Sequence, residues 1–461
     1  MKTEIDFIHS ENTTKTFLKM ALPMIAAMFL NLAYNMMDSI WVGNLLGESA
    51  MAALTSSTPI ILLLTAISMG ATNGLSILLS QKIGSGDKRQ AESLITTSFL
   101  TAVIFSVAMT VLLEWNLATL LHWLNTPAEI FGMAYDYLKI YLLGYVFTFL
   151  YLYFAALLRS YGNTSLQAIS ILLCTILDCI LDPIFILWIG FDGAAITTIL
   201  SESISVLILV VYLHHNKLFS LSLSTVNWKL VIPMAKNALP AVFQQSIPAI
   251  STSFLTAIVS GFSVTAIAGY GITGKLETIP FYPAMAINMV MTTIVGQCVG
   301  AKRMDKADEY VKCSIRTGVG IVTVLSLLVV FFANPLSRLF VNSDGVAELV
   351  STYFLIVGVG YVCNTITNCV LGAINGLGSP TAGMLLMVFY YLMVRMPLAW
   401  YWSTHTTFAL NGVWYAVLVS HIVACISSCL YYCYYRRKRV SGMQEMQTEE
   451  EKTESLSFYK E

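Results

Sequence analysis

Twelve apolar segments follow one another along this chain, and each is long enough to cross a lipid bilayer as a helix. About 20 apolar residues suffice for one crossing. The segments lie near 20–43, 51–81, 92–115, 131–158, 167–189, 193–215, 237–260, 266–300, 308–332, 347–374, 380–402 and 411–435. Only 11% of the 461 residues are charged, whereas soluble domains carry about 25%. The sequence therefore predicts an all-α integral membrane protein with twelve transmembrane helices.

Lysine and arginine are concentrated in alternate loops. They occur in residues 1–19, in the loop after segment two, in 216–236, in the loop after segment eight and in 436–439, while the opposite loops hold only Arg338. Cytoplasmic loops carry the excess of Lys and Arg. We therefore predict that both termini are cytoplasmic and that the protein resides in the plasma membrane.

The second half of the chain repeats motifs of the first half in the same order. Ala21-Leu22-Pro23 returns as Ala238-Leu239-Pro240, and Gly162-Asn163 returns as Gly378-Ser379. Each half holds six segments, so the two halves share one orientation and a pseudo-two-fold axis along the membrane normal. The predicted parts are a cytoplasmic N-terminus (1–19), an N-lobe (20–215), a cytoplasmic linker (216–236), a C-lobe (237–435) and a cytoplasmic tail (436–461). Two similar lobes are typical of a transporter that works by alternating access.

Ionisable side chains interrupt the apolar segments of the first half. Segment one carries Asn31, Tyr34, Asn35 and Asp38. Their steps of three and four predict one polar stripe along a helix. Asp178 and Asp182 lie one turn apart in segment five, and segment six contributes Glu202. A charge at mid-bilayer costs about 2.5–3.5 kcal/mol and by default indicates a functional site.

Counting about 1.5 Å per residue places these four acids in one layer of the predicted N-lobe. Neighbouring carboxylates in an apolar layer disfavour one another, so such a cluster is predicted to take up a proton from outside and release it inside. We predict Asp38 and Asp182 as the central pair. Asp178, Asn35, Thr198 and Ser201 are predicted to support them by hydrogen bonding. Glu202 is predicted either to join this cluster or to line a lobe interface.

No motif of a soluble enzyme or of a metal centre accompanies these acids. The nine cysteines contain no CxxC pair, which indicates neither a disulfide framework nor a zinc site. Walker A, HExxH and GxSxG motifs are absent from the sequence, so we predict that the protein is not an enzyme and needs no cofactor.

Taken together, the sequence motifs of this chain resemble those of the multidrug and toxic compound extrusion (MATE) family, and the resemblance extends from about residue 15 to about residue 435. The matching pieces are 21–23, 38–43, 81–84, 181–183 and 296–301. The likeness is closer to the DNA-damage-inducible-F branch, which keeps carboxylates in the first lobe. The resemblance implies a cation-coupled antiporter that exports lipophilic, often cationic drugs. The coupling ion would be a proton, or Na⁺ held at Asp38 and Asp182. We expect a monomer in the lipid bilayer, with no nucleic-acid partner.

The chain departs from the family pattern at two places. Sodium-coupled relatives also use acids in segments seven and ten, where this chain has Gln244 and Gln245, and Asn364 and Asn368. In addition, Asp178 stands where the family usually has asparagine. The missing acids of segments seven and ten argue against a sodium site in the second lobe. Tyr34, Gln244, Gln245, Lys275 and Glu277 are weaker candidates for the substrate cavity.

Other functions fit the sequence less well. A flippase for lipid-linked saccharides needs a basic cavity for pyrophosphate, but interior acids outnumber interior basic residues here. A membrane prenyltransferase is suggested by Asp178-Cys-Ile-Leu-Asp182, which resembles a diphosphate-binding DxxxD motif. Such enzymes need a second acidic motif, and no other lies in an apolar segment. The repeat and the clustered acids give no particular support to a channel. The leading prediction is a proton-coupled antiporter, with a sodium-coupled antiporter or a flippase as alternatives.

Overall fold

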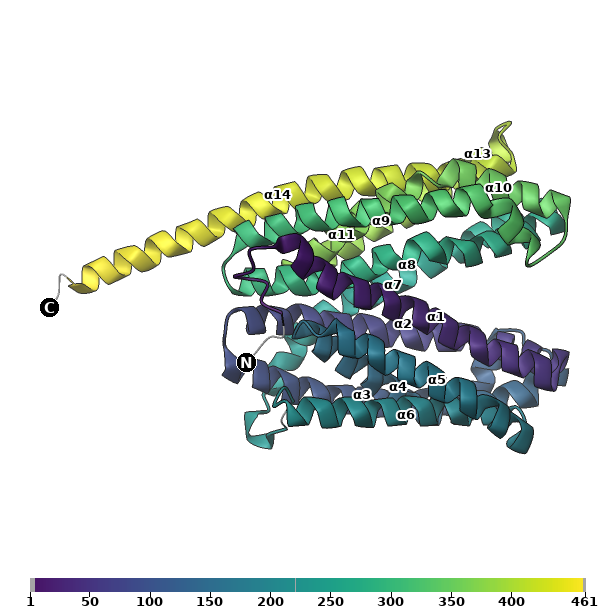
Figure 1. Cartoon of the computed structure of the whole chain (residues 1–461), viewed down its shortest axis with the longest axis horizontal. Helices are drawn as coiled ribbons and strands as arrows, with labels where there is room; N and C mark the ends of the chain where they lie inside the picture. The colour runs from purple at the N-terminus through teal and green to yellow at the C-terminus, as the bar shows by residue number, and fades with distance from the viewer. Residues whose placement is uncertain (1–4, 220, 459–461) are drawn as a thin grey trace. The chain divides into compact units, whose positions relative to one another are not determined.

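The computed structural model describes residues 5–219 and 221–458, and within these ranges the secondary structure is entirely helical (Figure 1). The helices are α1 (Thr13–Leu46), α2 (Glu48–Gly84), α3 (Lys88–Trp123), α4 (Ala128–Ser160), α5 (Thr164–Ile189), α6 (Asp192–His215), η1 (Leu223–Thr225), η2 (Trp228–Leu230), α7 (Val231–Ser260), α8 (Val264–Gly300), α9 (Met304–Arg338), α10 (Asp344–Val357), α11 (Gly360–Gly376), α12 (Pro380–Met387), the π-helical segment η3 (Val388–Arg395), α13 (Met396–His405) and α14 (Leu410–Phe458).

The described part of the chain contains eleven helical stretches that are long and apolar enough to cross a membrane. The bent pair α10 and α11 supplies a twelfth crossing, with 52° between its two helices. The predicted all-α membrane fold is therefore confirmed. The tenth segment departs from the single helix expected over 347–374, because it breaks at Gly358. There the Ser326 hydroxyl donates a hydrogen bond of 2.7 Å to the Gly358 carbonyl, and a side chain inserted into the backbone ladder bends a helix.

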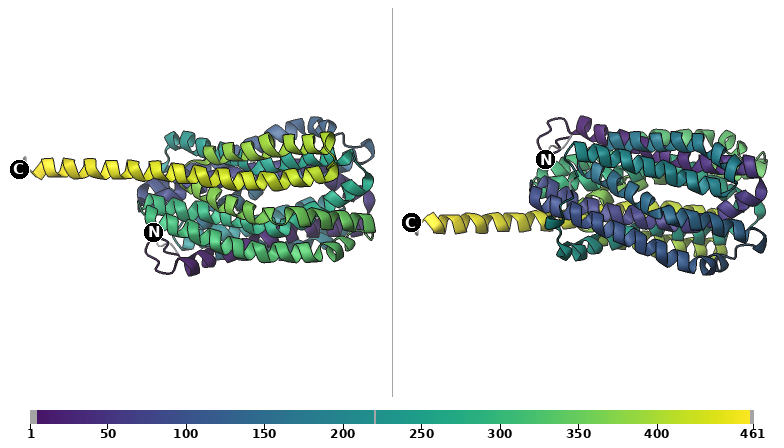
Figure 2. Two further views of the ribbon diagram at one scale, coloured as in Figure 1. Left: turned by 90° about the horizontal axis from the view of Figure 1, so that it is seen from above. Right: turned by 90° about the horizontal axis from the view of Figure 1, so that it is seen from below.

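The chain forms two compact units. Among the described residues, unit 1 contains 5–6, 15–219 and 221–249, and unit 2 contains 7–14 and 250–458. The helix α7 begins at Val231, inside the predicted linker 216–236, and its first part up to Ala249 belongs to unit 1. In unit 2, α14 continues through the predicted tail as far as Phe458. Figure 2 gives two further views of the helices in each unit.

The sequence repeat has a structural counterpart at two turns. Gly162 and Gly378 have φ angles of 85° and 84°, a left-handed conformation that glycine adopts without steric cost. Each glycine is followed by the N-cap of the next helix, Asn163 before α5 and Ser379 before α12. The Asn163 side chain accepts a hydrogen bond of 2.9 Å from the Leu166 amide. The two halves therefore begin their fifth and eleventh segments in the same way.

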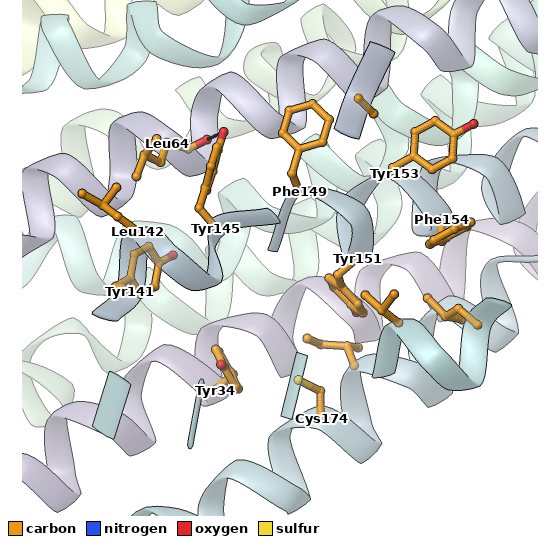
Figure 3. Packing of buried hydrophobic residues seen from close by; sticks show 14 of the residues in the cluster. Tyr34, Leu64, Tyr141, Leu142, Tyr145, Phe149, Tyr151, Tyr153, Phe154 and Cys174 are labelled. Atoms are coloured by element: carbon orange, nitrogen blue, oxygen red, sulfur yellow. Dashed lines mark hydrogen bonds between the residues drawn. The ribbon is translucent and has the colours of Figure 1, made fainter. Parts of the chain in front are cut away.

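Aromatic side chains of α4 form the middle of the unit 1 core (Figure 3). Tyr145 and Phe149 meet edge to face with their ring centroids 6.1 Å apart. The Tyr145 hydroxyl forms a hydrogen bond of 2.7 Å with Ser68 of α2, and the Tyr153 hydroxyl forms one of 2.9 Å with Ser98 of α3. These bonds satisfy buried hydroxyls that would otherwise be costly in an apolar core. They fix α4 against α2 and α3.

Unit 2 has a core of its own. Trp414 of α14 is fully buried, and its ring lies 4.9 Å from Tyr353 of α10 and 5.6 Å from Tyr270 of α8. Gly372 and Gly376 of α11 face the backbone of α8 at close range. Small residues four apart let two transmembrane helices approach each other closely.

Candidate functional site

Three aspartates meet inside unit 1. Asp38 comes from α1, and Asp178 and Asp182 come from α5; one carboxylate oxygen of each lies within 4.8 Å of the other two. Asp178 and Asp182 are fully buried, and Asp38 is partly buried. Among the described residues, this acid triad is the one group of three or more side chains arranged to hold a metal ion. The sequence predicted these three residues.

The local sequence explains the positions of the two α5 acids. Asp178 and Asp182 share the buried face of α5 with Ser170 and Cys174, at steps of four residues. The face of α5 turned away from them carries exposed apolar residues such as Ile180 and Ile184. A helix of this kind buries its polar stripe within the bundle and leaves its apolar face to the lipid.

The triad has few fixed hydrogen-bond donors. Thr197 of α6 donates its hydroxyl to Oδ1 of Asp182. In the described part of the chain, no donor bonds to either carboxylate oxygen of Asp178, to Oδ2 of Asp182 or to Oδ1 of Asp38. None of the ion pairs among the described residues joins a lysine or arginine to these three acids. Three like charges in one buried site need protons or a bound cation to compensate them.

A fourth acid and two tyrosines line the same interior. Glu202 of α6 is 8% exposed, accepts a hydrogen bond from the Thr148 hydroxyl, and acts electrostatically with Asp178. Tyr34 of α1 is buried and lies near the same acids, and in Figure 3 it lies on the same side of α4 as Cys174. Tyr137 of α4 is 2% exposed and lies near all three aspartates of the triad. Glu202 therefore lies in the interior with the triad.

Several predicted neighbours of the triad occupy other places. Asn35 is exposed, and its side-chain amide donates a hydrogen bond of 2.7 Å to the Asn31 carbonyl in its own helix. Thr198 is buried but donates to the Ala194 carbonyl at 3.0 Å. Ser201 is buried beside Asp178, but its hydroxyl lacks hydrogen-bond geometry to a described acceptor. Successive helix residues differ by about 100° in direction, so Tyr34 faces the interior while Asn35 does not.

Two contributors to the site were not among the predicted residues. Thr197, rather than its neighbour Thr198, bonds to Asp182. Two adjacent threonines at the depth of the acids indicate a hydrogen-bond donor in α6. Which of the two faces Asp182 depends on the rotation of α6 about its axis. Tyr137 gave no polar signal of its own, because it lies in an aromatic-rich segment where most rings pack in the core.

The weaker cavity candidates divide between the two units. Gln244 is buried and Gln245 partly buried, both in the part of α7 that belongs to unit 1. In unit 2, Lys275 is exposed, with its Nζ 5.2 Å from the centroid of the Phe340 ring. Glu277 is partly buried and acts electrostatically with Arg395. Gln244 and Gln245 therefore lie in unit 1, whereas Lys275 and Glu277 lie in unit 2.

Arg395 is held by three different contacts, and we expect Arg395→Lys to destabilise the protein. Its Nε donates to Ser420 at 2.7 Å, its Nη2 lies 3.3 Å from His421 Nε2, and its guanidinium lies 4.4 Å from the Tyr391 ring centroid. A lysine ammonium cannot reproduce this planar arrangement, so the expected loss is about 1–3 kcal/mol.

Thermal unfolding in detergent measures this loss. The matched control is Arg338→Lys, because Arg338 pairs with Asp344 at an exposed site where such pairs contribute about 0–1 kcal/mol. Equal midpoints for the two variants would show that the contacts of Arg395 are not stabilising.

Comparison with known proteins gives a consistent result. The MatE family matches the chain twice, at residues 23–184 and 240–401, so that each match begins at the proline of the repeated Ala-Leu-Pro motif. The probable multidrug resistance protein YpnP of Bacillus subtilis is 25% identical, over 94% of this chain and 97% of that protein. The FAD transporter of Shewanella oneidensis is 24% identical, over 92% of this chain and 94% of that protein.

A solved structure shares the fold. The Vibrio cholerae MATE transporter VcmN in its bent form has a TM-score of 0.88, is 22% identical, and the match covers 93% of this chain and 98% of that one. The two family matches together span well over half of the chain. The chain therefore belongs to the MatE family of multidrug and toxic compound extrusion transporters.

Proposed function

We propose that the protein is a proton-coupled antiporter that exports lipophilic, often cationic compounds by alternating access. The observation that supports this most directly is the acid triad of Asp38, Asp178 and Asp182, which is buried and has no basic partner among the described residues. Such a site is stable only when protons or a cation reduce its charge. Its occupancy therefore changes with the ion concentration on the side to which it is open.

The coupling cycle follows from this change of charge. A proton that binds from outside neutralises part of the triad, so that α1, α5 and α6 pack more favourably around it. We propose that this packing favours release of the drug outward and then the inward-facing state, in which the proton leaves. A charge that crosses about 100 mV supplies about 2.3 kcal/mol, which supports a modest uphill gradient of drug.

Sodium is the second candidate for the coupling ion. The carboxylate oxygens of the triad converge within 4.8 Å, a spacing that also suits a cation held by several oxygens. Sodium would bind at Asp38 and Asp182, with Asp178 as a further ligand. In both cases we propose that the transporter acts as a monomer in the plasma membrane with cytoplasmic termini, and that it uses no prosthetic cofactor and catalyses no chemical reaction.

Ethidium efflux from proteoliposomes tests the proposal. A pH gradient and a sodium gradient are imposed separately on the wild type and on Asp38→Asn. We expect efflux with the pH gradient alone and its loss in the variant. Efflux that follows only the sodium gradient would replace the proton with sodium.

If neither gradient moves ethidium, the drug substrate is wrong. FAD and a lipid-linked saccharide are then the next substrates to test, because a relative is named an FAD transporter and a flippase is the remaining alternative.

A further inference from the structure

An apolar cavity of about 420 Å³ is lined by residues of unit 1, and none of them belongs to the acid triad. Its walls come from α2, α3, α4 and the first part of α7, and small side chains such as Ala71, Ala102 and Ala235 leave it open. The volume falls within the range of about 300–1,000 Å³ that ligand pockets occupy. None of the lining residues is charged.

Every polar side chain in the wall of this cavity already has a hydrogen-bond acceptor within the protein. Thr72 donates to the Ser68 carbonyl at 2.8 Å, and Thr101 donates to the Thr97 carbonyl at 2.8 Å. Ser98 and Tyr153 both bond to the Ile95 carbonyl, at 3.0 and 2.9 Å. A lipophilic cation would find no counter-ion among these lining residues, and burying an unpaired charge is costly. The lining therefore fits a hydrocarbon chain.

One face of α7 forms the side of the cavity. The lining positions Val231, Ala235, Ala238 and Val242 recur at steps of three or four along this helix. The helix is held close to α2, because a Cβ on Gly74 would lie 2.5 Å from the Cα of Ala238. The wall is thus set by backbone packing, and the space is not removed by a small inward shift of α7.

Two basic residues lie close to lining residues of α7 in the sequence. The Asn227 amide donates a hydrogen bond of 3.0 Å to Thr97, the residue before the lining Ser98. Two residues after Asn227, the exposed Lys229 precedes the lining residue Val231, and Lys236 follows on α7, also exposed. Trp228 between them is 57% exposed. Tryptophan and lysine at the end of a transmembrane helix are typical of the lipid head-group level.

We propose that this cavity binds one acyl chain of an anionic phospholipid, with the phosphate at Lys229 and Lys236. By the distribution of Lys and Arg, the lipid belongs to the cytoplasmic leaflet. Each basic residue near an anionic membrane surface contributes about 1 kcal/mol of attraction, and the chain supplies apolar contact. The proposal is independent of the coupling ion and of the exported substrate.

Native mass spectrometry of the delipidated protein tests the site, with phosphatidylglycerol and phosphatidylcholine added in equal amounts. Ala235→Phe and Ala102→Leu fill the cavity from two different helices. We expect the wild type to retain one phosphatidylglycerol more than either variant. Ile232→Phe is the matched control, because Ile232 is 65% exposed on α7 and does not line the cavity. Unchanged unfolding midpoints without lipid confirm that the filled variants are folded.

The lysines are tested separately. The double variant Lys229→Gln and Lys236→Gln is expected to keep a bound lipid but to lose the preference for phosphatidylglycerol by about 30-fold, because two attractions of about 1 kcal/mol are removed. Equal lipid retention by the wild type and both filled variants would overturn the site. An unchanged preference in the lysine variant would overturn the anionic head group. Displacement of the retained lipid by ethidium would assign the cavity to a drug instead.

Discussion

Asp182→Asn is expected to lower efflux driven by a pH gradient by about 5- to 150-fold, the range of a coupling free energy of about 1–3 kcal/mol. Asparagine has nearly the size of aspartate, and its amide oxygen still accepts the hydroxyl of Thr197. The substitution therefore leaves the packing of α5 on α6 in place and removes the charge from the triad. Efflux measured at a fixed pH difference, with protein content equalised, reports this loss.

The matched control is Asp136→Asn, the same chemical change at an exposed carboxylate of α4 in unit 1. Its efflux is expected to equal that of the wild type. If the two variants lose activity equally, the effect comes from the overall charge of the protein rather than from the triad. If Asp182→Asn transports normally, the triad does not carry the coupling ion.

Gly372→Leu is expected to destabilise the protein by about 3 kcal/mol, because it forces α11 away from α8. A Cβ at Gly372 would lie 2.3 Å from the Asn288 carbonyl oxygen and 2.9 Å from the Cβ of Met291. The nearest of these atoms belongs to the backbone, so no side-chain rotation can relieve the contact. The unfolding midpoint in detergent and the yield of monodisperse protein measure the effect.

Gly320→Leu provides the control for this substitution. Gly320 lies in α9, is exposed, and has open space where a Cβ would be. Leucine is a better helix former than glycine by about 0.8 kcal/mol, so this variant is expected to be at least as stable as the wild type. A large loss in both variants would mean that leucine itself, and not the approach of α11 to α8, disturbs the fold.

The fold and the three aspartates were predictable from the sequence for a simple reason. Membrane spans are recognised by composition and length, and a carboxylate within such a span is rare enough to mark a site. The steps of four residues between Asp178 and Asp182 place both on one helix face whatever the surroundings. The repeated Ala-Leu-Pro motif likewise indicated two halves, and the two family matches start at its two copies.

The remainder of the site depended on the rotation of each helix about its axis. The steps of three and four in α1 made one stripe of Asn31, Tyr34, Asn35 and Asp38, but only Tyr34 and Asp38 turn inward. In α6, Thr197 donates a hydrogen bond to Asp182, whereas Thr198 donates to a carbonyl of its own helix. The polar residues of such a helix spread over a wider part of its circumference than the part that faces the bundle interior. The sequence pattern alone therefore fixes the inward-facing position only to within about one residue.

By itself, the sequence determined the number of crossings, the two-fold repeat and the presence of intramembrane acids, because each depends on residue type and spacing within one helix. The tertiary structure decided which acids meet, that Thr197 bonds to Asp182 and Tyr137 lies near the triad, where the tenth segment bends and that an apolar cavity lies beside α7. These features arise from contacts between helices distant in the chain. Such contacts depend on how side chains of different sizes pack together, and no periodicity within a single segment records that packing.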